Sequence, residues 1–351
     1  MVRVGRVGRR VLITGLSSFW GGRLAQAFER DTSIDVIVGL DTGEPLVALE
    51  RTEFVRTDEN YSILARLVRA TQVDTVVHAA LVVDSSTTSD RHIHENNVIG
   101  TMNLLAAAAN EDSHVRSLVV KSSTLVYGCS GSDPTWFRET TPRSAAPRTR
   151  VERSLVEVES YLRSFAEENR DINVAVLRCA NVLGDDLVTA LSKALSLPLT
   201  PTIAGFDPQI QFVEQDDVIR AIEFVVNNGL VGVYNLAGDG RLPWSEIRAI
   251  AGRRPLLLSP VLTAMAVAPL TRLGLELPPE TLELLRYGRG VDNFKLKNNG
   301  FTYRYSTAGA VRHFVENQRL LGVVGETEPS YHYQGDVETF FRHSPAIVRT
   351  P

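Results

Sequence analysis

Residues 10–22 carry the strongest structural signal of the chain, because a short apolar run, a glycine turn and a helical pattern follow one another there. The apolar run 11–13 is typical of a buried strand, and Gly15 interrupts it. From Gly21 onward, apolar residues recur with helical spacing. A helix that begins after a strand and a tight turn presents free N–H groups and the positive end of its dipole. This order therefore predicts a phosphate-binding cradle.

An acidic residue ends the next apolar run. Asp41 follows residues 36–40 and stands 20 positions after Gly21. That spacing is typical of a carboxylate that binds the adenosine ribose of a dinucleotide. An ordinary βαβ unit of a flavodoxin-like fold is the alternative interpretation, since glycine turns between strands and helices are common.

Ser18 departs from the pattern expected of such a turn. The form Thr-Gly-x-x-Gly-x-x-Gly requires glycine at position 18, where the backbone approaches the pyrophosphate closely. We expect the serine side chain to crowd the dinucleotide or to shift it. Dinucleotide binding should therefore be weakened and not abolished.

Apolar runs alternate with helical patterns over the first half of the chain. Strands are predicted at 53–58, 74–80, 115–121 and 172–177, and helices at 97–109 and 150–168. This rhythm predicts the α/β class, with a Rossmann-type, doubly wound parallel sheet. After residue 180 the rhythm changes, and a smaller α+β part is expected. The predicted division is a dinucleotide domain at 1–180, a substrate-type lid at 181–321 and a polar tail at 322–351, which is either mobile or wraps the surface.

The composition excludes some classes of protein. A formal net charge of −4 over 351 residues gives no basic field for nucleic acid. Cys129 and Cys179 are the two cysteines, too few for a disulfide framework or a zinc site, so no metal is predicted and a reducing cytosol is indicated. The first ten residues lack the apolar core of a signal peptide. We therefore expect a cytoplasmic protein.

Several stretches together resemble the extended short-chain dehydrogenase/reductase family of NAD-dependent epimerases and dehydratases. The resemblance covers roughly residues 9–318. It implies an N-terminal NAD(P) domain and a C-terminal substrate lid. The stretches that carry it are Thr14-Gly15 with Gly21, Asp41, Asp58, His78-Ala79-Ala80, residues 97–101, residues 122–128, Leu177-Arg178, residues 181–184, residues 211–218 and residues 234–238.

The resemblance implies how NAD is held. Gly15 and Gly21 would face the pyrophosphate, and Asp58 would lie beside the adenine amine. Asp41 would bind the ribose hydroxyls and favour NAD over NADP, because a carboxylate repels a 2′-phosphate. Turn acids at strand ends are the alternative for Asp41 and Asp58, and His78 is expected in the core. The predicted cofactor-binding residues are Thr14, Gly15, Ser18, Phe19, Gly21, Asp41, Asp58, Ala79, Ala80 and Asn97.

The chemistry of the family uses a Tyr-x-x-x-Lys pair on the helix at 150–168. No tyrosine stands between Tyr127 and Tyr161, and no lysine between Lys121 and Lys193. A tyrosine with a pKa near 10 is a poor base without the neighbouring cation. The pair is therefore expected to be absent in any register.

A count within the chain shows what replaces the pair. Glu159 stands 19 residues before Arg178, the interval that the resemblance implies. Counting back from Glu159 places Val151 at the tyrosine position and Leu155 at the lysine position. Ser123 matches the catalytic serine or threonine of the family and is interpreted as a remnant, and Tyr127 matches a common non-catalytic tyrosine of the family.

Nearby residues offer partial substitutes for the pair. Arg150 or Arg153 could hold a ribose or a phosphate, but a guanidinium is not a useful base, whereas Glu152 could act as one. Asn181 matches a uridine-contact asparagine of the family. The arginine expected beside a nucleoside diphosphate falls at Ile210, so a UDP-sugar substrate is not expected.

Two functions remain open at this point. The first is a catalytically degenerate family member that still binds NAD weakly and acts as a structural or regulatory partner of another protein, including one at a membrane. The alternative is an NAD-dependent epimerase, dehydratase or hydroxysteroid-type oxidoreductase with a displaced base.

Two segments are candidates for contact with a protein partner or, peripherally, with the cytosolic face of a membrane. Residues 255–271 carry no charge, and residues 322–351 contain aromatic residues in a polar context. A packed lid helix at 255–271 and a tail that covers its own substrate domain are the alternatives. The resemblance also implies a homodimer through 97–109 and 150–168, where one apolar stripe contains Val151, Leu155, Val158, Leu162 and Phe165.

Overall fold

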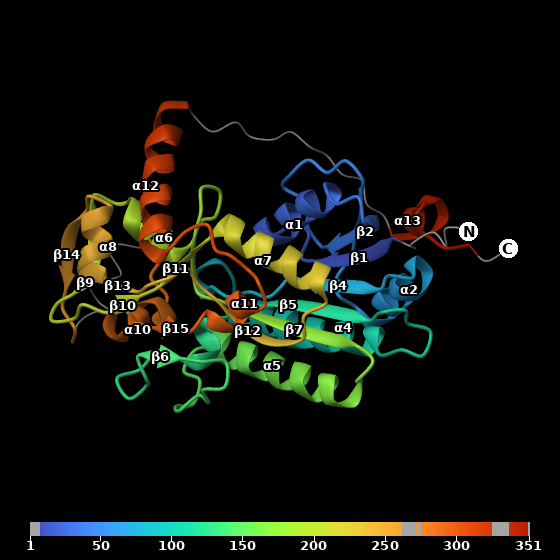
Figure 1. Ribbon diagram of the computed structural model, residues 1–351, viewed down its shortest axis with the longest axis horizontal. Coiled ribbons are helices and arrows are strands. Elements are labelled where there is room, and N and C mark those ends of the chain that lie inside the picture. The colour runs from blue at the N-terminus through green and yellow to red at the C-terminus, as the bar shows by residue number, and fades with distance from the viewer. Residues whose placement is uncertain (1–7, 262–270, 272–274, 325–336, 350–351) are drawn as a thin grey trace.

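A seven-stranded parallel sheet forms the centre of the molecule (Figure 1). The computed structural model describes residues 8–261, 271, 275–324 and 337–349. The sheet confirms the predicted Rossmann-type α/β class. Its strand order is β12 (Gly232–Leu236), β7 (Asn173–Cys179), β5 (Ser117–Ser123), β4 (Thr75–His78), β1 (Arg9–Thr14), β2 (Ile34–Asp41) and β3 (Thr52–Arg56).

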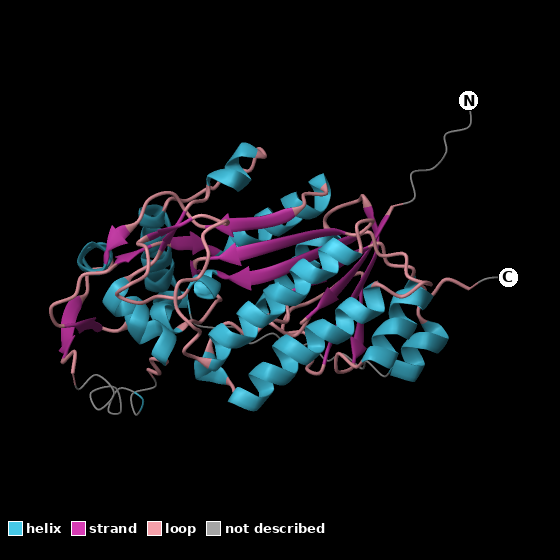
Figure 2. Cartoon of the chain, turned by 90° about the horizontal axis from the view of Figure 1, so that it is seen from below, coloured by secondary structure: helices cyan, strands magenta, loops and turns pink. Residues whose placement is uncertain are grey.

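Helices cover both faces of this sheet. Helices α1 (Phe19–Glu29) and α7 (Gln215–Asn228) pack on one face. The opposite face carries α2 (Tyr61–Thr71), α4 (Thr101–Ala108) and α5 (Arg150–Glu168), and Figure 2 shows helices lying across the strands from that side. Because apolar side chains point to both faces of the sheet, its central strands are buried on both sides.

The C-terminal part consists of short paired strands and helices around Trp244, which is almost fully buried. Strand β12 leaves this part and joins the main sheet beside β7, so the chain crosses between the two parts more than once. The strand pairs are β8 (Asn181–Leu183) with β11 (Phe212–Glu214), β9 (Leu199–Ile203) with β14 (Arg254–Leu258), β10 (Gln209–Ile210) with β13 (Leu242–Pro243) and β15 (Gly290–Val291) with β6 (Trp136–Phe137). The helices are α6 (Ala190–Ser196), α8 (Trp244–Ile250), α10 (Pro279–Tyr287), α11 (Phe294–Asn298) and α12 (Thr307–Val324).

Two predicted helices differ from the structure. The helix expected at 97–109 begins as a π-helix, η2 (Glu95–Gly100), after the short helix α3 (Asp90–His94). The helix considered at 255–271 is wrong for its first residues, because the chain there forms strand β14 through pairing with β9. Residues 262–270 lie outside the described part of the chain. Among the described helices, none is long and apolar enough to cross a bilayer.

The described end of the tail packs on the N-terminal part, so it wraps the surface, one of the two predicted alternatives. Helix α13 (Val337–His343) lies against β3, and Phe340 is buried in the core beneath α2. Arg66 of α2 lies 3.8 Å from the ring centroid of Phe341 and pairs with Glu338 at 3.0 Å. The domain that the tail covers is the dinucleotide domain and not the substrate-type part. Tyr331 and Tyr333, two of the predicted docking aromatics, lie outside the described residues.

The apolar stripe predicted for a dimer interface belongs to the core of a single chain. Its five members on α5 are all less than 10% exposed and pack toward the sheet. Ile99 and Met102, on the neighbouring helical segment, are 45% and 46% exposed. Helix α5 therefore gives no unburied stripe of its own to a second chain, and the dimer stays a prediction.

Candidate active site

The glycine turn after β1 has the geometry that the sequence predicts. Gly15 adopts a φ of +77°, and a Cβ atom there would lie 2.6 Å from the Cα of Ala80. A Cβ on Gly21 would lie 2.1 Å from the carbonyl oxygen of Gly15. Because no side chain fits at either position, both glycines are required for the turn to bring α1 against the sheet.

Ser18 caps the N-terminus of α1. Its hydroxyl donates to the Gly15 carbonyl oxygen at 2.6 Å and accepts from the N–H of Gly21 at 3.1 Å. The N–H of Gly22 bonds to the Ser18 carbonyl oxygen. Within the described residues, this leaves the N–H groups of Phe19 and Trp20 for the phosphates of a ligand. Ser18 thus removes one donor from the cradle but keeps the turn intact.

Asp41 stands at the end of β2, beside this turn. One carboxylate oxygen accepts the N–H of Ser17 at 2.9 Å, and the other accepts the N–H of Thr42 at 2.7 Å. Each oxygen keeps a lone pair for a further donor. The carboxylate is therefore held in a fixed orientation and can still accept the hydroxyls of a ribose.

A cavity of about 450 Å³, which we call the turn cavity, connects these groups. The predicted residues that line it are Gly15, Ser18, Asp41, Asp58 and Ala80. The predicted residues that do not line it are Thr14, Phe19, Gly21, Ala79 and Asn97. Asn97 is fully buried and binds the backbone N–H and carbonyl of Val82, while its neighbour Asn96 lines the cavity.

Glu59 enters the turn cavity, and sequence reasoning did not identify it. Its Oε2 is buried without a hydrogen-bond partner, and its Oε1 lies 3.9 Å from Nδ1 of His78. Burial raises the pKa of Glu59 to about 7, and the charge of Asp41 acts in the same direction. His78 itself is a core residue, as predicted: it binds Thr14 and Thr101, and burial lowers its pKa to about 4. The sequence did contain a signal for Glu59, since this glutamate directly follows Asp58 at the end of a predicted strand.

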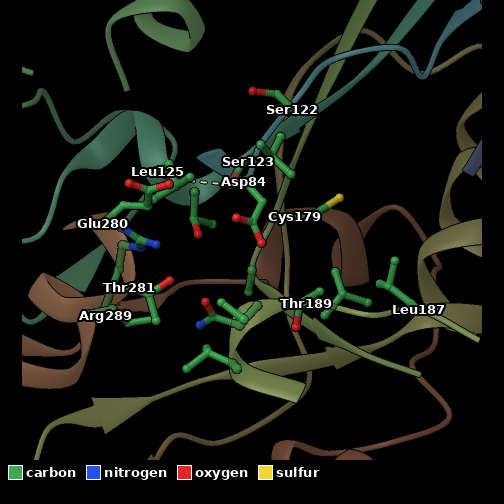
Figure 3. A pocket seen from close by; sticks show the side chains of 18 of the residues that line it. Asp84, Ser122, Ser123, Leu125, Cys179, Leu187, Thr189, Glu280, Thr281 and Arg289 are labelled. Carbon is green, nitrogen blue, oxygen red and sulfur yellow. Dashed lines mark hydrogen bonds between the residues drawn. The ribbon is translucent and has the colours of Figure 1, made fainter. Parts of the chain in front are cut away.

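A second cavity, of about 220 Å³, lies at the carboxyl ends of β5 and β7, and we call it the Ser123 cavity. Ser123 lines it, and so does Asn181 from β8. Figure 3 shows Glu280, Thr281 and Arg289 on one side of the cavity and Cys179 and Leu187 on the other. Cys179 belongs to β7 of the sheet, whereas Leu187, Glu280 and Arg289 come from the part of the chain after residue 180.

Four further acidic or basic residues line the Ser123 cavity and were not identified from the sequence: Asp84, Lys121, Glu280 and Arg289. Burial lowers the pKa of Lys121, and it also raises the pKa of Glu280. Glu280 binds the backbone N–H and the hydroxyl of Ser85 through Oε1, while its Oε2 is buried without a partner. Opposed pKa shifts within one cavity are typical of functional sites.

Helix α5 contributes nothing to the lining of the Ser123 cavity. Val151 and Leu155 are fully buried in the core, and α5 contains no lysine. Glu152, considered above as a base, is held by Arg143 at 2.6 Å and lies outside the cavity. The positions that the family resemblance assigns to the Tyr-x-x-x-Lys pair are thus structural in this chain.

Behind the cavity, Arg178 and Glu159 form a buried ion pair, which accounts for the interval of 19 residues between them. Nη2 of Arg178 lies 2.5 Å from Oε2 of Glu159, and Nε lies 3.0 and 3.1 Å from the two oxygens. The hydroxyl of Tyr127 donates to Asn235 and accepts from Arg178. Tyr127 is therefore a structural residue, as predicted.

The glycine turn, the acid after β2 and two cavities at the carboxyl ends of a parallel sheet define a dinucleotide-binding type of Rossmann protein. The model of the NAD dependent epimerase/dehydratase family matches residues 11–237. The chain belongs to this family, as the sequence motifs predict.

Relatives support this assignment. The uncharacterized protein Rv0501 of Mycobacterium tuberculosis (strain ATCC 25618 / H37Rv) is 32% identical over 322 residues, which are 90% of this chain and 85% of that protein. The dTDP-glucose 4,6-dehydratase of Bacillus anthracis, solved in complex with NAD, superposes with a TM-score of 0.69 at 19% identity, over 90% of this chain and 98% of its own. The UDP-glucose 4-epimerase of Thermotoga maritima, solved with UDP-glucose, superposes with a TM-score of 0.69 at 18% identity. The superposition covers 89% of this chain and 99% of that chain. At these identities the two structures show the shared fold alone.

Replacing Ser18 by glycine is expected to tighten NAD binding about tenfold, or by about 1.4 kcal/mol. The change removes a side chain from the cradle and frees the N–H of Gly21 for a phosphate oxygen. Titration calorimetry with NAD measures the effect. Ser17→Ala is the matched control, because Ser17 does not line the turn cavity and keeps the N–H that binds Asp41. Equal affinities for Ser18→Gly and the parent protein would contradict the assignment of the cradle.

Proposed function

We propose that this protein is an NAD-dependent oxidoreductase of the epimerase/dehydratase type that transfers protons through Glu280 in place of the tyrosine of the family. One observation carries the proposal: Glu280, whose Oε2 has no partner, and Ser123 line one cavity at the carboxyl ends of β5 and β7. The family match and the relatives solved with NAD support the choice of cofactor.

The residues of the turn cavity fit NAD. Gly15 and Gly21 allow the tight turn that a Cβ would block, the first N–H groups of α1 suit a pyrophosphate, and Asp41 suits ribose hydroxyls. Asp41, Asp58, Glu59 and Glu95 line the cavity, and His92 is its one basic side chain. A 2′-phosphate would face these carboxylates, so NAD is favoured over NADP. Bound NAD would supply the hydride acceptor and donor.

Ser123 and Glu280 would handle the proton of a substrate hydroxyl. Ser123 accepts the N–H of Leu125 at 3.3 Å, so its own proton is free to orient a substrate oxygen. Oε2 of Glu280 can take the proton when that hydroxyl becomes a carbonyl, and it returns the proton in the reverse direction. A carboxyl whose pKa is raised by burial is suited to this exchange near neutral pH.

Turnover with a panel of uronic acids, sugar phosphates, nucleotide sugars and hydroxysteroids tests the proposal, with product formation as the readout for redox-neutral reactions and reduced cofactor as the readout for net oxidation. Glu280→Gln and Ser123→Ala are each expected to lower kcat by about 10²–10³-fold. Glu283→Gln is the matched control: it lies one turn further along α10, pairs with Arg148 and does not line the cavity. Undiminished turnover in Glu280→Gln would contradict the role of Glu280.

A second candidate function is the partner protein without catalysis, and the apolar positions 151 and 155 on α5 favour it. Such a protein would bind NAD as a structural ligand and contact other chains. The described part of 322–351 is occupied by contacts with its own domain, so 255–271 is the better docking candidate. A melting temperature that rises with NAD, together with no turnover on any substrate of the panel, would favour this function.

A further inference from the structure

Two cations of the Ser123 cavity are buried without a direct ion pair, although the carboxylates of Asp84 and Glu280 line the same cavity. Lys121 is 2% exposed and Arg289 is 5% exposed. Neither forms an ion pair within the described residues. The ammonium of Lys121 lies 4.6 Å from the ring centroid of Trp20, and Arg289 donates from Nη1 to the Gly128 carbonyl at 3.0 Å. The Nε of Arg289 is buried with no hydrogen-bond partner.

Such an arrangement is costly, because each buried cation loses its hydration and gains only one neutral contact in return, the Trp20 ring or the Gly128 carbonyl. The same molecule satisfies other buried cations in the usual way. Arg178 is bound by both oxygens of Glu159, and Arg143 is paired with Glu152 at 2.6 Å. Burial lowers the pKa of both Lys121 and Arg289, and the more distant acidic groups around them offset this effect only in part.

Lys121 and Arg289 do not lie where they could bind the phosphates of NAD. The pyrophosphate site is the glycine turn, which belongs to the turn cavity, whereas Lys121 and Arg289 line the Ser123 cavity. The nicotinamide ring of oxidised NAD itself carries a positive charge, so the positive charges of Lys121 and Arg289 would be unfavourable beside it. The charges are therefore available to a second ligand.

The remaining chemistry of the Ser123 cavity narrows the ligand. Glu280 Oε2 is a fixed acceptor with no donor, and Figure 3 shows Glu280 and Arg289 on the same side of the cavity. A volume of about 220 Å³ lies below the usual range of ligand sites, which suits a molecule of monosaccharide size. Residue 210, where a diphosphate-binding arginine would stand, is a fully buried isoleucine.

We propose that the Ser123 cavity binds a small hydroxylated organic anion, whose carboxylate or phosphate is neutralised by Lys121 and Arg289 and whose hydroxyl donates to Glu280. The inference deepens the proposed function by naming its substrate class. It makes the substrate an acid in its own right and not a sugar carried on a nucleoside diphosphate.

Binding to the NAD-free protein tests this inference without any need for turnover. The probes are D-glucuronate, D-glucose 6-phosphate and uncharged D-glucose, measured by titration calorimetry and by thermal shift. Binding of glucuronate alone identifies a carboxylate ligand, and binding of glucose 6-phosphate alone identifies a phosphate. If neither anion binds, or if glucose binds as well as they do, the inference is overturned.

Variants separate an anion site from a structural role of the two cations. Lys121→Met and Arg289→Met should each weaken anion binding at least tenfold, whereas Arg312→Gln, an exposed arginine on α12, should leave it unchanged. Lys121→Met should also raise the melting temperature of the ligand-free protein, because it removes an unpaired buried charge. A lower melting temperature in Lys121→Met with unchanged anion affinity would show that Lys121 is structural.

Anion binding without turnover would refute the proposed function alone, and turnover of uncharged alcohols without anion binding would refute this inference alone.

Discussion

Replacing Glu159 by glutamine is expected to destabilise the protein by about 3–5 kcal/mol, since breaking a buried ion pair leaves an uncompensated buried charge. Arg178 would keep its bonds to Tyr127 and to the carbonyl of Glu139 but lose its counterion, because glutamine offers one neutral oxygen and an NH2 donor in place of the carboxylate. Ser122, which donates to Glu159 at 2.7 Å, would also lose a charged acceptor. Equilibrium denaturation with urea measures the free energy of unfolding.

Asp112→Asn is the control for this experiment. Asp112 pairs with Arg69 at 3.6 Å, and both side chains are more than half exposed, so solvent screens the pair. Its loss should leave the denaturation midpoint unchanged. If Glu159→Gln had the same midpoint as Asp112→Asn, the ion pair between β7 and α5 would have no part in holding the sheet to its helix layer.

The second large effect concerns Glu59 and appears as a change of stability with pH. The pKa of Glu59 is about 7 in the folded protein because of burial and the nearby Asp41, against an ordinary value of 4.5. Between these two values the folded state holds a proton that the unfolded state has lost. Stability therefore falls as pH rises through this window, by about 3 kcal/mol in total for this group.

Glu59→Gln removes this dependence, because glutamine stays neutral at every pH. The variant and the parent protein should differ little at pH 4.5, and the variant should be more stable by about 3 kcal/mol above pH 7. His78 acts in the opposite direction, since burial lowers its pKa to about 4 and stability from this group rises with pH. Because Nδ1 of His78 lies 3.9 Å from Oε1 of Glu59, the comparison is read above pH 6.5, where the imidazole is neutral in both states.

Denaturation at a series of pH values tests this expectation. Glu50→Gln, at an exposed position, should give a difference from the parent that does not vary with pH. A flat difference for Glu59→Gln as well would mean that Glu59 is ionised throughout the window and that its environment in the turn cavity compensates the charge.

Local patterns were sufficient to predict the first half of the fold. The glycine turn, the acid at the end of β2 and the bounds of α5 are each encoded by residues close together in the sequence. The interval between Glu159 and Arg178 could be read in the same way, because it reflects one helix packed on the strand that follows it. The core position of His78 and the structural role of Tyr127 followed from these elements.

The Ser123 cavity could not be predicted in the same way. Lys121 and Glu280 are far apart in sequence and meet only because the C-terminal part folds back over the sheet. The resemblance assigns Asn97 to the cofactor, whereas Asn96 is the asparagine that lines the turn cavity, at a segment that forms the π-helix η2. Strand β14 was missed because its apolar run fits a strand and a buried helix equally well.

The order of strands in the sheet has a consequence for biosynthesis. Both edges of the sheet are finished late: β12 is made at residues 232–236, and α13, which packs on the opposite edge strand β3, is made at 337–343. While the ribosome translates residues 237–336, the strands of the sheet have all been made but β3 is not yet covered by α13. An open edge strand is a template for aggregation. A nascent chain released before residue 337 would lack the contacts of Glu53 with Ser344 and Ala346. The domain that is made first thus depends on the last residues of the chain for its protection.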